Sequence, residues 1–433
     1  MDTISIFWFR RDLRLHDNVA LYHALQSEEK ILPIFIFDKE ILEKIPKNDA
    51  RISFIHKELN TMNEHLKSFE AGISMFHGTP TEIFQSLIKK YNVVKVFTNH
   101  DYEPYAIKRD LEIKELLASN TIEFHTYKDQ VIFERNEITK KDGTPYVVYT
   151  PYSKKWMEAY HINAQKNYPS EDLLSGFYSS VKPTVLTLDD IGFTETRIPI
   201  KNYIFNSRII NEYEETRNFP ALDNTSKLGP HLRFGTVSVR QMASRADAQE
   251  NKIFLKELIW REFFMQILWH FPQTHKDSFK SKYDRINWRN NEEEFKKWCN
   301  GTTGYPMVDA GMRQLNETGF MHNRVRMLVG SFLCKHLLID WRWGEAYFAE
   351  KLHDYEMSSN VGNWQWVAGT GVDASPYFRI FNPTSQIQKF DKELKYIQKW
   401  VPDFQELTYP TPMVEHKYNG CYSFVLICRI YTN

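Results

Sequence analysis

The sequence predicts an α/β N-terminal domain, with a doubly wound, mostly parallel five-stranded sheet, followed by an all-α C-terminal domain. Two observations lead to this prediction. Through the first 130 residues, short apolar runs rich in β-branched and aromatic residues alternate with helical patterns, which is the order typical of an open parallel sheet. From about residue 206 onward, the chain is almost wholly helix and loop in pattern.

The elements of the first domain follow from the positions of these runs. The predicted strands are 4–10, 31–38, 73–77, 93–99 and a fifth within 122–133. The predicted helices are 18–27, 52–69, 80–91 and 105–118. Pro80 and Pro104 mark two helix starts, because the fixed φ of proline suits a first helical turn. Asp17 or Asn18 is the expected N-cap of the first helix.

The rest of the chain divides by composition. Helix breakers such as KDGTPY, NYPS and VKPT crowd the stretch after the predicted sheet, which indicates a linker. The predicted ranges are an α/β domain at 1–130, a linker at 131–205, a helical domain at 206–415 and an atypical apolar tail at 416–433.

Composition excludes several classes of protein. The formal net charge is zero, which argues against a bulk electrostatic nucleic-acid binder and leaves only a local basic patch. The four cysteines form no CxxC motif, so no metal site is expected. No apolar run approaches the roughly 20 residues that span a bilayer, and the N-terminus lacks a signal-peptide pattern. We expect a cytoplasmic monomer with no membrane partner.

The second half contains three informative helical patterns. Apolar residues recur at spacings of three and four through 322–338, and a second helix is predicted at Trp343–Leu352. The segment 256–271 is also helical in pattern, with Glu257 and Trp260 at its border. Trp364 and Trp366 are two residues apart, so on a helix they point in different directions.

The loop FPALDNTSKLGPHLRFGTVS, 219–238, is dense in Asn, Thr, Ser and Gly. Backbone amides and short hydroxyls in such a loop suit a pyrophosphate. The same composition is also typical of an ordinary turn that caps a helix. The chain has no GxGxxG and no GxxxxGK[ST], so neither a dinucleotide fingerprint nor a P-loop is predicted.

Several runs carry a family resemblance: WFRRDLRLHDN, MHNRVRM, IDW, NVGNWQW and DASPYFRIFNPTSQ. Through them the sequence resembles the DNA photolyase and cryptochrome family, from Ile4 to about His416, and most closely the class I cyclobutane pyrimidine dimer photolyases. The resemblance implies a flavoprotein that uses FAD, active in its reduced form, and blue light to repair UV-damaged DNA. The alternative within the family is a photoreceptor of cryptochrome type that does not repair DNA.

The resemblance also implies the residues around FAD. The phosphate-binding positions are Tyr213, Thr225, Ser226, Lys227, Leu228 and Gly229. The positions near the flavin ring are Asn323, Arg326, Asp354, Tyr355, Glu356 and Asn360. Arg326 is the expected partner of Asp354, since a buried charge needs a counter-charge. Asn360 matches the catalytic position beside flavin N5, where an amide can hydrogen-bond without acting as an acid.

The family positions for the lesion and for electron transfer follow in the same way. Glu257 is implied as the catalytic acceptor for the lesion bases, and Trp364, Trp341 and Trp288 as the electron-transfer triad. The implied DNA and lesion contacts are Arg217, Glu257, Trp260, Arg261, Phe264, Asn323, Arg324, Met327 and Trp366. An aromatic slot with one carboxylate suits thymine, which has flat faces and an N3–H donor.

Three further alternatives remain open. A (6-4) photoproduct photolyase is disfavoured because relatives of that kind carry paired histidines where this chain has Met321-His322-Asn323. A flavoprotein that binds DNA without photochemistry is disfavoured by the three tryptophans. A second, antenna chromophore could be a deazaflavin or a folate, or the antenna site could be empty; Asp101 and Glu103 resemble the deazaflavin pattern.

Overall fold

The computed structural model describes residues 2–163, 166–374, 376 and 379–415. The chain forms two compact units that interleave along the sequence. The first comprises 1–137, 156–202 and 228–248, and the second comprises 138–155, 203–227 and 249–433. Segment 228–248, which lies in the predicted helical range, therefore belongs to the first unit. The predicted tail at 416–433 lies outside the described residues.

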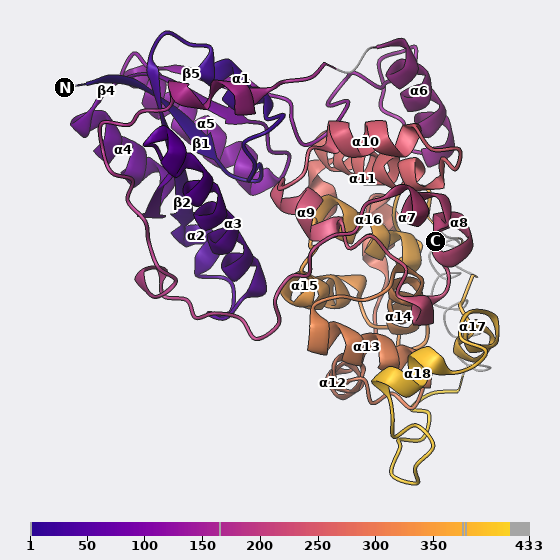
Figure 1. Cartoon of the computed structure of the whole chain (residues 1–433). Helices are drawn as coiled ribbons and strands as arrows, with labels where there is room; N and C mark the ends of the chain where they lie inside the picture. Colours follow the sequence, from indigo (N-terminus) through magenta and orange to yellow (C-terminus); the bar gives the residue numbers. More distant parts are fainter. Residues whose placement is uncertain (1, 164–165, 375, 377–378, 416–433) are drawn as a thin grey trace. The chain divides into compact units, whose positions relative to one another are not determined.

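The first unit contains a five-stranded parallel sheet in the order β3-β2-β1-β4-β5. The strands are β1 Thr3–Phe9, β2 Lys30–Asp38, β3 Ser74–Gly78, β4 Asn92–Asn99 and β5 Glu123–Tyr127. The helices between them are α1 Val19–Leu25, α2 Lys39–Leu42, α3 Ala50–Leu66, α4 Pro80–Lys90 and α5 Pro104–Ser119. Figure 1 shows these elements in the indigo and purple part of the chain. The predicted sheet is confirmed, and only the short α2 was missed.

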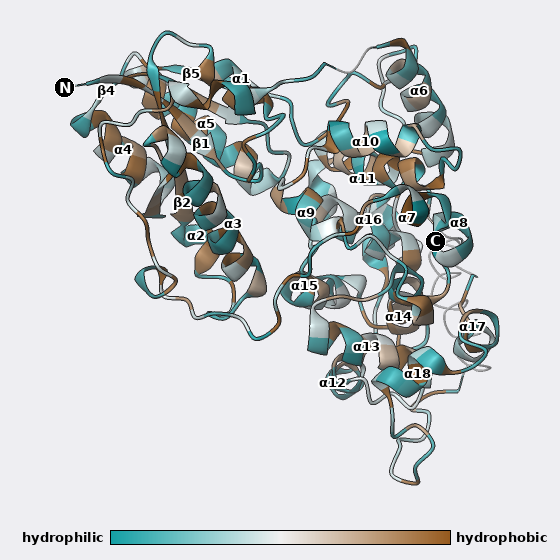
Figure 2. Ribbon diagram, viewed as in Figure 1, coloured by the Kyte–Doolittle hydropathy of each residue, from teal (hydrophilic) through white to brown (hydrophobic). Residues whose placement is uncertain are grey.

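Both faces of this sheet are buried, as alternation along its strands requires. Phe7 and Phe9 of β1 pack in the core cluster that includes residues of α1 and α3. Ile6 and Trp8 point to the other face and share a cluster with residues of α4 and α5. Figure 2 shows hydrophobic residues around β1 and β2, which are buried along almost their whole length. Burial on both faces explains why the strands appear in the sequence as continuous apolar runs.

Side-chain caps set the helix starts of the first unit. The Asn18 side chain accepts a hydrogen bond from the Leu21 backbone N–H at 3.2 Å, so Asn18 is the N-cap of α1. Of the two predicted N-caps, Asp17 and Asn18, the structure has Asn18. Thr79 and Glu82 form a reciprocal capping box at α4, with Pro80 in the first turn. These short-range bonds fix where the helices begin.

The second unit is predominantly helical. Its described helices include α7 Ser207–Asn211, α8 Tyr213–Thr216, α11 Ile253–His270, α12 Glu292–Asn300, α13 Pro306–Thr318, α14 Asn323–Lys335, α15 Trp341–Lys351, α16 Met357–Ala368, α17 Pro383–Phe390 and α18 Lys395–Trp400. Helix α6, Tyr149–Ile162, begins in this unit, while α9 Gly229–Phe234 and α10 Val239–Asp247 belong to the first. The predicted helices over 322–338, 343–352 and 256–271 correspond to α14, α15 and α11.

One large apolar cluster holds the second unit together. Its buried members come mainly from α13, α14, α15 and α16. Phe332 and Leu333 of α14 are fully buried, and Trp341 and Trp364 are 1% and 3% exposed. The tryptophans of α15 and α16 therefore lie in the same core as the apolar face of α14. This packing brings the polar faces of α14 and α16 to a common opening.

Candidate functional site

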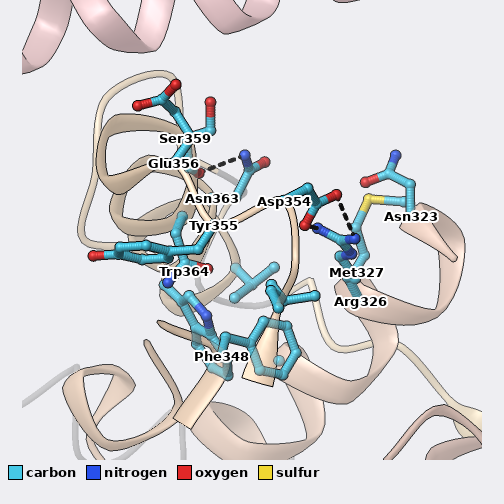
Figure 3. A pocket seen from close by; sticks show the side chains of 14 residues that line it. Asn323, Arg326, Met327, Phe348, Asp354, Tyr355, Glu356, Ser359, Asn363 and Trp364 are labelled. Atoms are coloured by element: carbon cyan, nitrogen blue, oxygen red, sulfur yellow. Dashed lines mark hydrogen bonds and ion pairs between the residues drawn. The ribbon is translucent and has the colours of Figure 1, made fainter. Parts of the chain in front are cut away.

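A pocket opens in the second unit between α14, the end of α15 and α16. It spans about 580 Å³ when the open solvent at its mouth is included. Its walls combine apolar side chains with three asparagine amides and a paired charge (Figure 3). The lining residues predicted for the flavin ring are Asn323, Arg326, Asp354, Tyr355, Glu356 and Asn360, and Met327 and Trp364 also line it.

An ion pair forms one side of this pocket. Arg326 donates from both terminal nitrogens to Asp354, at 3.2 and 2.9 Å, and its Nε donates to the Met321 carbonyl at 2.7 Å. Figure 3 shows the two side chains meeting at the pocket wall. Such a two-point pair fixes both planes and keeps the partly buried charges compensated. The predicted pairing of Arg326 with Asp354 is confirmed.

The Asn360 amide is held by a residue that sequence reasoning missed. Its Nδ2 donates to the Glu345 Oε1 at 2.9 Å and to the Glu345 carbonyl at 3.1 Å. Burial raises the pKa of the Glu345 carboxyl, and hydrogen bonds from Asn360 and Tyr355 partly offset this rise. Glu345 lies one turn beyond Trp341 on α15. Trp341 is a predicted site residue, so a polar residue one turn further on the same helix face could have been recognised from the sequence as a candidate.

Glu356 has an arginine partner. It is 6% exposed, and Arg261 donates to its Oε2 at 3.4 Å. Arg261 was expected among the DNA contacts, but its side chain is only 13% exposed and its charge is directed to a pocket residue. In this structure Arg261 neutralises the buried carboxylate of Glu356 in the pocket wall, because a buried carboxylate requires a cation nearby.

The predicted phosphate loop has an unusual backbone. Asp223 and Lys227 both adopt positive φ, 47° and 55°, a region that non-glycine residues rarely occupy and that is enriched at binding sites. The Lys227 Nζ contacts Asp223 at 2.6 Å and lies 3.7 Å from the centroid of the Phe320 ring. Arg326 also lies over Phe320, at 5.9 Å, so this ring links the loop to the pocket's arginine.

The loop also contains an orphaned polar atom. Among the described residues, no partner satisfies the buried Oγ1 of Thr225, and a buried hydroxyl without a partner is unfavourable. A phosphate oxygen would satisfy it. Tyr213 and Ser226 belong to the same unit, while Leu228 and Gly229 lead into α9 of the first unit. Together with the pocket, this hydroxyl fits an FAD molecule.

Trp364 connects the pocket to the core. It lines the pocket, and its ring lies 5.0 Å from Phe348 and 6.2 Å from Trp298. A Cβ atom added at Gly344 of α15 would lie 2.2 Å from the Trp364 ring. Only glycine therefore allows α15 and Trp364 to approach this closely.

The other two tryptophans of the predicted triad follow outward from this contact. Trp341 stands three residues before Gly344, on the same side of α15. Trp288 is half-buried against the same core. Its neighbour Arg289 donates its backbone N–H to the Leu338 carbonyl at 2.8 Å, and Asn290 accepts from the Asp340 N–H at 2.9 Å. The segment that carries Trp288 is thus bonded to the start of α15.

The predicted lesion residues lie on α11 and α16. Glu257 pairs with Arg217 at 2.5 Å, so two residues expected at the DNA are each other's partners. Burial raises the pKa of Glu257, and the Arg217 charge lowers it. Trp260 is half-buried beside Phe264, at a centroid distance of 5.6 Å, and Trp366 is half-buried at the rim of the core.

Three arginines gather in the second unit. Arg324 donates to the Asn218 side chain and lies 4.4 Å over the Phe390 ring. Burial lowers the pKa of Arg324, and the charges of Arg217 and Arg379 lower it further. Like charges in proximity are unfavourable without an anion between them. Arg379 was not among the arginines predicted at the DNA, which are Arg217, Arg261 and Arg324.

In the first unit, the two carboxylates of the deazaflavin-like pattern are paired. Arg11 contacts Asp101 at 3.1 Å and Glu103 at 3.3 Å, and Arg233 contacts Glu103 at 2.5 Å. Burial would raise the pKa of Asp101, but Arg11 and other arginines outweigh it and hold this pKa well below its usual range. Both carboxylates are therefore engaged by protein cations.

Across the described part of the chain, no group of three or more His, Cys, Asp or Glu side chains is placed to hold a metal ion. None of the helices in the described ranges combines the length and apolarity that crossing a membrane demands.

Comparison with known proteins agrees with this geometry. The DNA photolyase family matches residues 5–170, and the FAD binding domain of DNA photolyase matches residues 254–419. A deoxyribodipyrimidine photo-lyase of Agrobacterium fabrum is 35% identical, over 95% of each chain. A bacterial class III photolyase from Agrobacterium tumefaciens superimposes with a TM-score of 0.89 at 32% identity, covering 100% of this chain and 98% of its own.

An archaeal photolyase from Sulfolobus tokodaii, solved with two FAD molecules, has a TM-score of 0.84 at 33% identity and covers 99% of this chain and 100% of its own. The matches span both units and almost the whole length of the relatives. The two family matches, the near-complete coverage and the pocket of α14–α16 lead to one conclusion: the chain belongs to the DNA photolyase family.

Proposed function

We propose that this protein is a light-driven deoxyribodipyrimidine photo-lyase that repairs cyclobutane pyrimidine dimers in UV-damaged DNA. The observation that carries the proposal is the pocket, where the Arg326–Asp354 pair, the fixed Asn360 amide and the buried Trp364 line one cavity. The protein is proposed to act as a cytoplasmic monomer. The class I subtype remains a prediction.

Reduced FAD, when bound and excited by blue light, supplies the electron that opens the cyclobutane ring and takes it back afterwards. The flavin-ring positions are Asn323, Arg326, Asp354, Tyr355, Glu356 and Asn360. The Arg326–Asp354 pair offers a fixed, compensated charge, and Asn360 presents its carboxamide oxygen, since its nitrogen is engaged by Glu345. The phosphate positions are Tyr213, Thr225, Ser226, Lys227, Leu228 and Gly229.

The lesion is recognised by a carboxylate and aromatic walls. Glu257 accepts a hydrogen bond from thymine N3–H; burial raises the pKa of this carboxyl, and the charge of its partner Arg217 opposes the rise. Trp260 and Trp366 provide flat apolar faces, with Phe264 behind Trp260. Met327 and Asn323 border the flavin side of the slot. A pyrimidine dimer must leave the duplex to reach such a slot. Extruding a damaged pair costs less free energy than extruding a normally stacked pair. Base flipping by photolyases is an established example of this extrusion.

The arginine cluster is assigned to the DNA backbone. Arg324 is the main phosphate contact, and Arg217 and Arg379 add charge beside it. Phosphate contacts position DNA without reading its sequence, which fits an enzyme that acts wherever damage occurs. A local patch of this kind also reconciles DNA binding with a net charge of zero.

Trp288, Trp341 and Trp364 are assigned to electron entry from the surface. Burial increases from the half-buried Trp288 to the other two, the segment that carries Trp288 is hydrogen-bonded to the start of α15, and Trp364 packs against Gly344 of α15. This route prepares the enzyme and is separate from repair. A second chromophore, a deazaflavin or a folate, is proposed for the first unit as an antenna.

The decisive experiment is repair of an oligothymidylate that carries cyclobutane dimers. Pre-reduced protein is illuminated with blue light beside a dark control, and the ultraviolet absorbance of the restored thymines is followed. Light-dependent recovery is expected. Glu257→Ala should lose repair while keeping its flavin, because Glu257 does not line the flavin pocket.

The contrary outcomes are distinct. A protein that binds and photoreduces flavin without repairing the dimer would be a cryptochrome-type photoreceptor. Repair only of (6-4) photoproducts would assign it to the other class of photolyase. Equal loss of flavin and repair in Glu257→Ala would remove Glu257 from lesion recognition.

A further inference from the structure

Trp260 has an aromatic partner from a distant part of the chain. The ring of Tyr149 lies parallel to it, with a centroid distance of 3.5 Å and an interplanar angle of 5°. Tyr149 is the first residue of α6 and is 9% exposed. Its segment, 138–155, belongs by its contacts to the second unit. The fold thus brings a linker residue face to face with a predicted lesion contact.

Two further bonds fix the position of Tyr149. Its hydroxyl donates to the Lys256 carbonyl at 2.8 Å, one turn before Trp260 on α11. Its backbone N–H donates to the Asp373 Oδ2 at 3.1 Å. Asp373 lies in the segment that follows α16, the helix that carries Trp366. Tyr149 is therefore attached to the helix of one aromatic wall and to the chain that leaves the other.

We propose, on the basis of the lesion slot assigned above, that Tyr149 is a positioning residue for damage recognition. It covers one face of the Trp260 indole and ties α11 to the segment after α16. A lesion base then meets an indole that is already held in place. Phe263, at 5.7 Å and 82°, supports the same indole from its edge.

The physical reason is preorganisation. An indole without backing can reorient, and that freedom must be lost when a base stacks on it. Aromatic rings in contact contribute beyond the area they bury, most strongly in offset or edge-to-face pairs such as Phe263 with Trp260. Because the Tyr149 ring already restricts the Trp260 indole, little conformational freedom is lost when DNA binds. Tyr149 should therefore affect the affinity for the extruded dimer. It should leave the flavin pocket and the phosphate contacts unchanged.

The test compares three variants in flavin-loaded, full-length protein. Tyr149→Leu removes the ring, Tyr149→Phe keeps the ring and removes only the hydroxyl, and Tyr152→Leu is the matched control. Tyr152 lies on the same helix, is 1% exposed, and its ring is tilted against Phe263 at a centroid distance of 5.2 Å. The measurements are dissociation constants for an oligonucleotide with one cyclobutane dimer and for the same oligonucleotide undamaged, with the repair rate at saturating DNA.

The expected result is a selective loss of discrimination. Tyr149→Leu should lower the preference for damaged over undamaged DNA by about fivefold to tenfold, which is the equilibrium effect of losing one aromatic stack. Affinity for undamaged DNA and the saturated repair rate should stay near wild type. Tyr149→Phe should retain the preference to within about twofold, since only one hydrogen bond is lost.

Other outcomes overturn the inference. Wild-type discrimination in Tyr149→Leu, or an equal loss in Tyr152→Leu, would show that Tyr149 has no special role. If Tyr149→Leu fails to fold, Asp373→Gly replaces it as the test, because Asp373 is exposed and glycine accepts its φ of 45°. Unchanged discrimination in that variant would equally contradict the proposal.

The failure of this inference is distinguishable from failure of the proposed function. If the wild-type protein neither prefers nor repairs dimer-containing DNA in light, the proposed function is wrong. If the wild-type protein does both and the Tyr149 variants match it, only the positioning role is wrong.

Discussion

The amide nitrogen of Asn360 donates to the carboxylate of Glu345 at 2.9 Å and to the carbonyl of the same residue at 3.1 Å. Because both partners are acceptors, the amide can adopt only one of its two orientations. The carboxamide oxygen is then the end left for a ligand in the pocket that Asn360 lines. Glu345 on α15 thus determines which atom of the Asn360 amide on α16 faces the ligand.

Removing Glu345 should therefore release the Asn360 amide without emptying the pocket. Glu345→Leu is expected to bind FAD but, once reduced, to reoxidise in air about tenfold to a hundredfold faster, the scale of one charge-assisted hydrogen bond. Glu345→Gln keeps an acceptor oxygen and should stay within about twofold of wild type. The measurement is the return of the oxidised flavin absorbance after reduction. Equal rates in all three proteins would contradict the role of Glu345.

His322 predicts a pH dependence of stability. It is 3% exposed, and burial, together with Lys227, Arg326 and Arg324, lowers its pKa to about 4. The folded-state pKa lies below the ordinary value, so the unfolded chain binds this proton more readily. The contribution is fully present above about pH 6.5 and is lost as the pH falls toward 4.

The size of this effect is about 3 kcal/mol, from the difference between the ordinary and the lowered pKa. His322→Asn is the control, since asparagine is a good N-cap and can replace the bond in which His322 Nδ1 accepts from the Arg324 N–H at 3.2 Å. Urea unfolding between pH 7 and about 4.5 should show a smaller loss of stability in His322→Asn than in wild type. Parallel curves for the two proteins would rule out this origin of the pH dependence.

Two glycines facing Trp364 predict a graded packing effect. A Cβ atom at Gly344 would lie 2.2 Å from the Trp364 ring and 2.6 Å from Leu333, whereas one at Gly330 would lie 3.1 Å from Val367 and 3.5 Å from Trp364. Gly344→Ala should destabilise the protein by about 1–3 kcal/mol through overpacking. Gly330→Ala should cost less, and helix propensity partly offsets its cost. Denaturant unfolding measures both, and a reversed order would contradict this packing.

The tryptophan series predicts a separation of two activities. Trp288→Phe should abolish photoreduction of the oxidised protein in vitro, because phenylalanine is a much poorer electron donor at the surface end of the route. Repair by chemically pre-reduced protein should remain at the wild-type rate, since Trp288 does not line the flavin pocket. Flash photolysis and the dimer assay measure the two. Loss of repair in pre-reduced Trp288→Phe would show that the triad is assigned wrongly.

Sequence reasoning was strongest where structure is local. The strands over Thr3–Phe9 and Asn92–Asn99, the N-cap at Asn18 and the helix over Asn323–Lys335 all follow from residues close in the chain. The Arg326–Asp354 pair was also predicted, across 28 residues. Family motifs, together with the rule that buried charges are paired, made that prediction possible.

Partner choice across the fold was predicted less well. The sequence did not indicate that Arg217 pairs with Glu257 or Arg261 with Glu356, and the expected DNA contacts of both arginines stay predictions. No local pattern reports which of several cations lies nearest to a buried acid. The same applies to Tyr149, whose stacking on Trp260 depends on how the linker returns to the second unit.

The sequence by itself determined the fold class, the family and the residue types of the site, because periodicity, caps and motifs are written in neighbouring residues. Only the tertiary structure decided which groups are free and which are already engaged: the Asn360 nitrogen with Glu345, Asp101 with Arg11, and Trp260 with Tyr149. The reason is physical. A hydrogen bond or a stacked ring needs distances and angles, and these are set by packing between elements far apart in the chain.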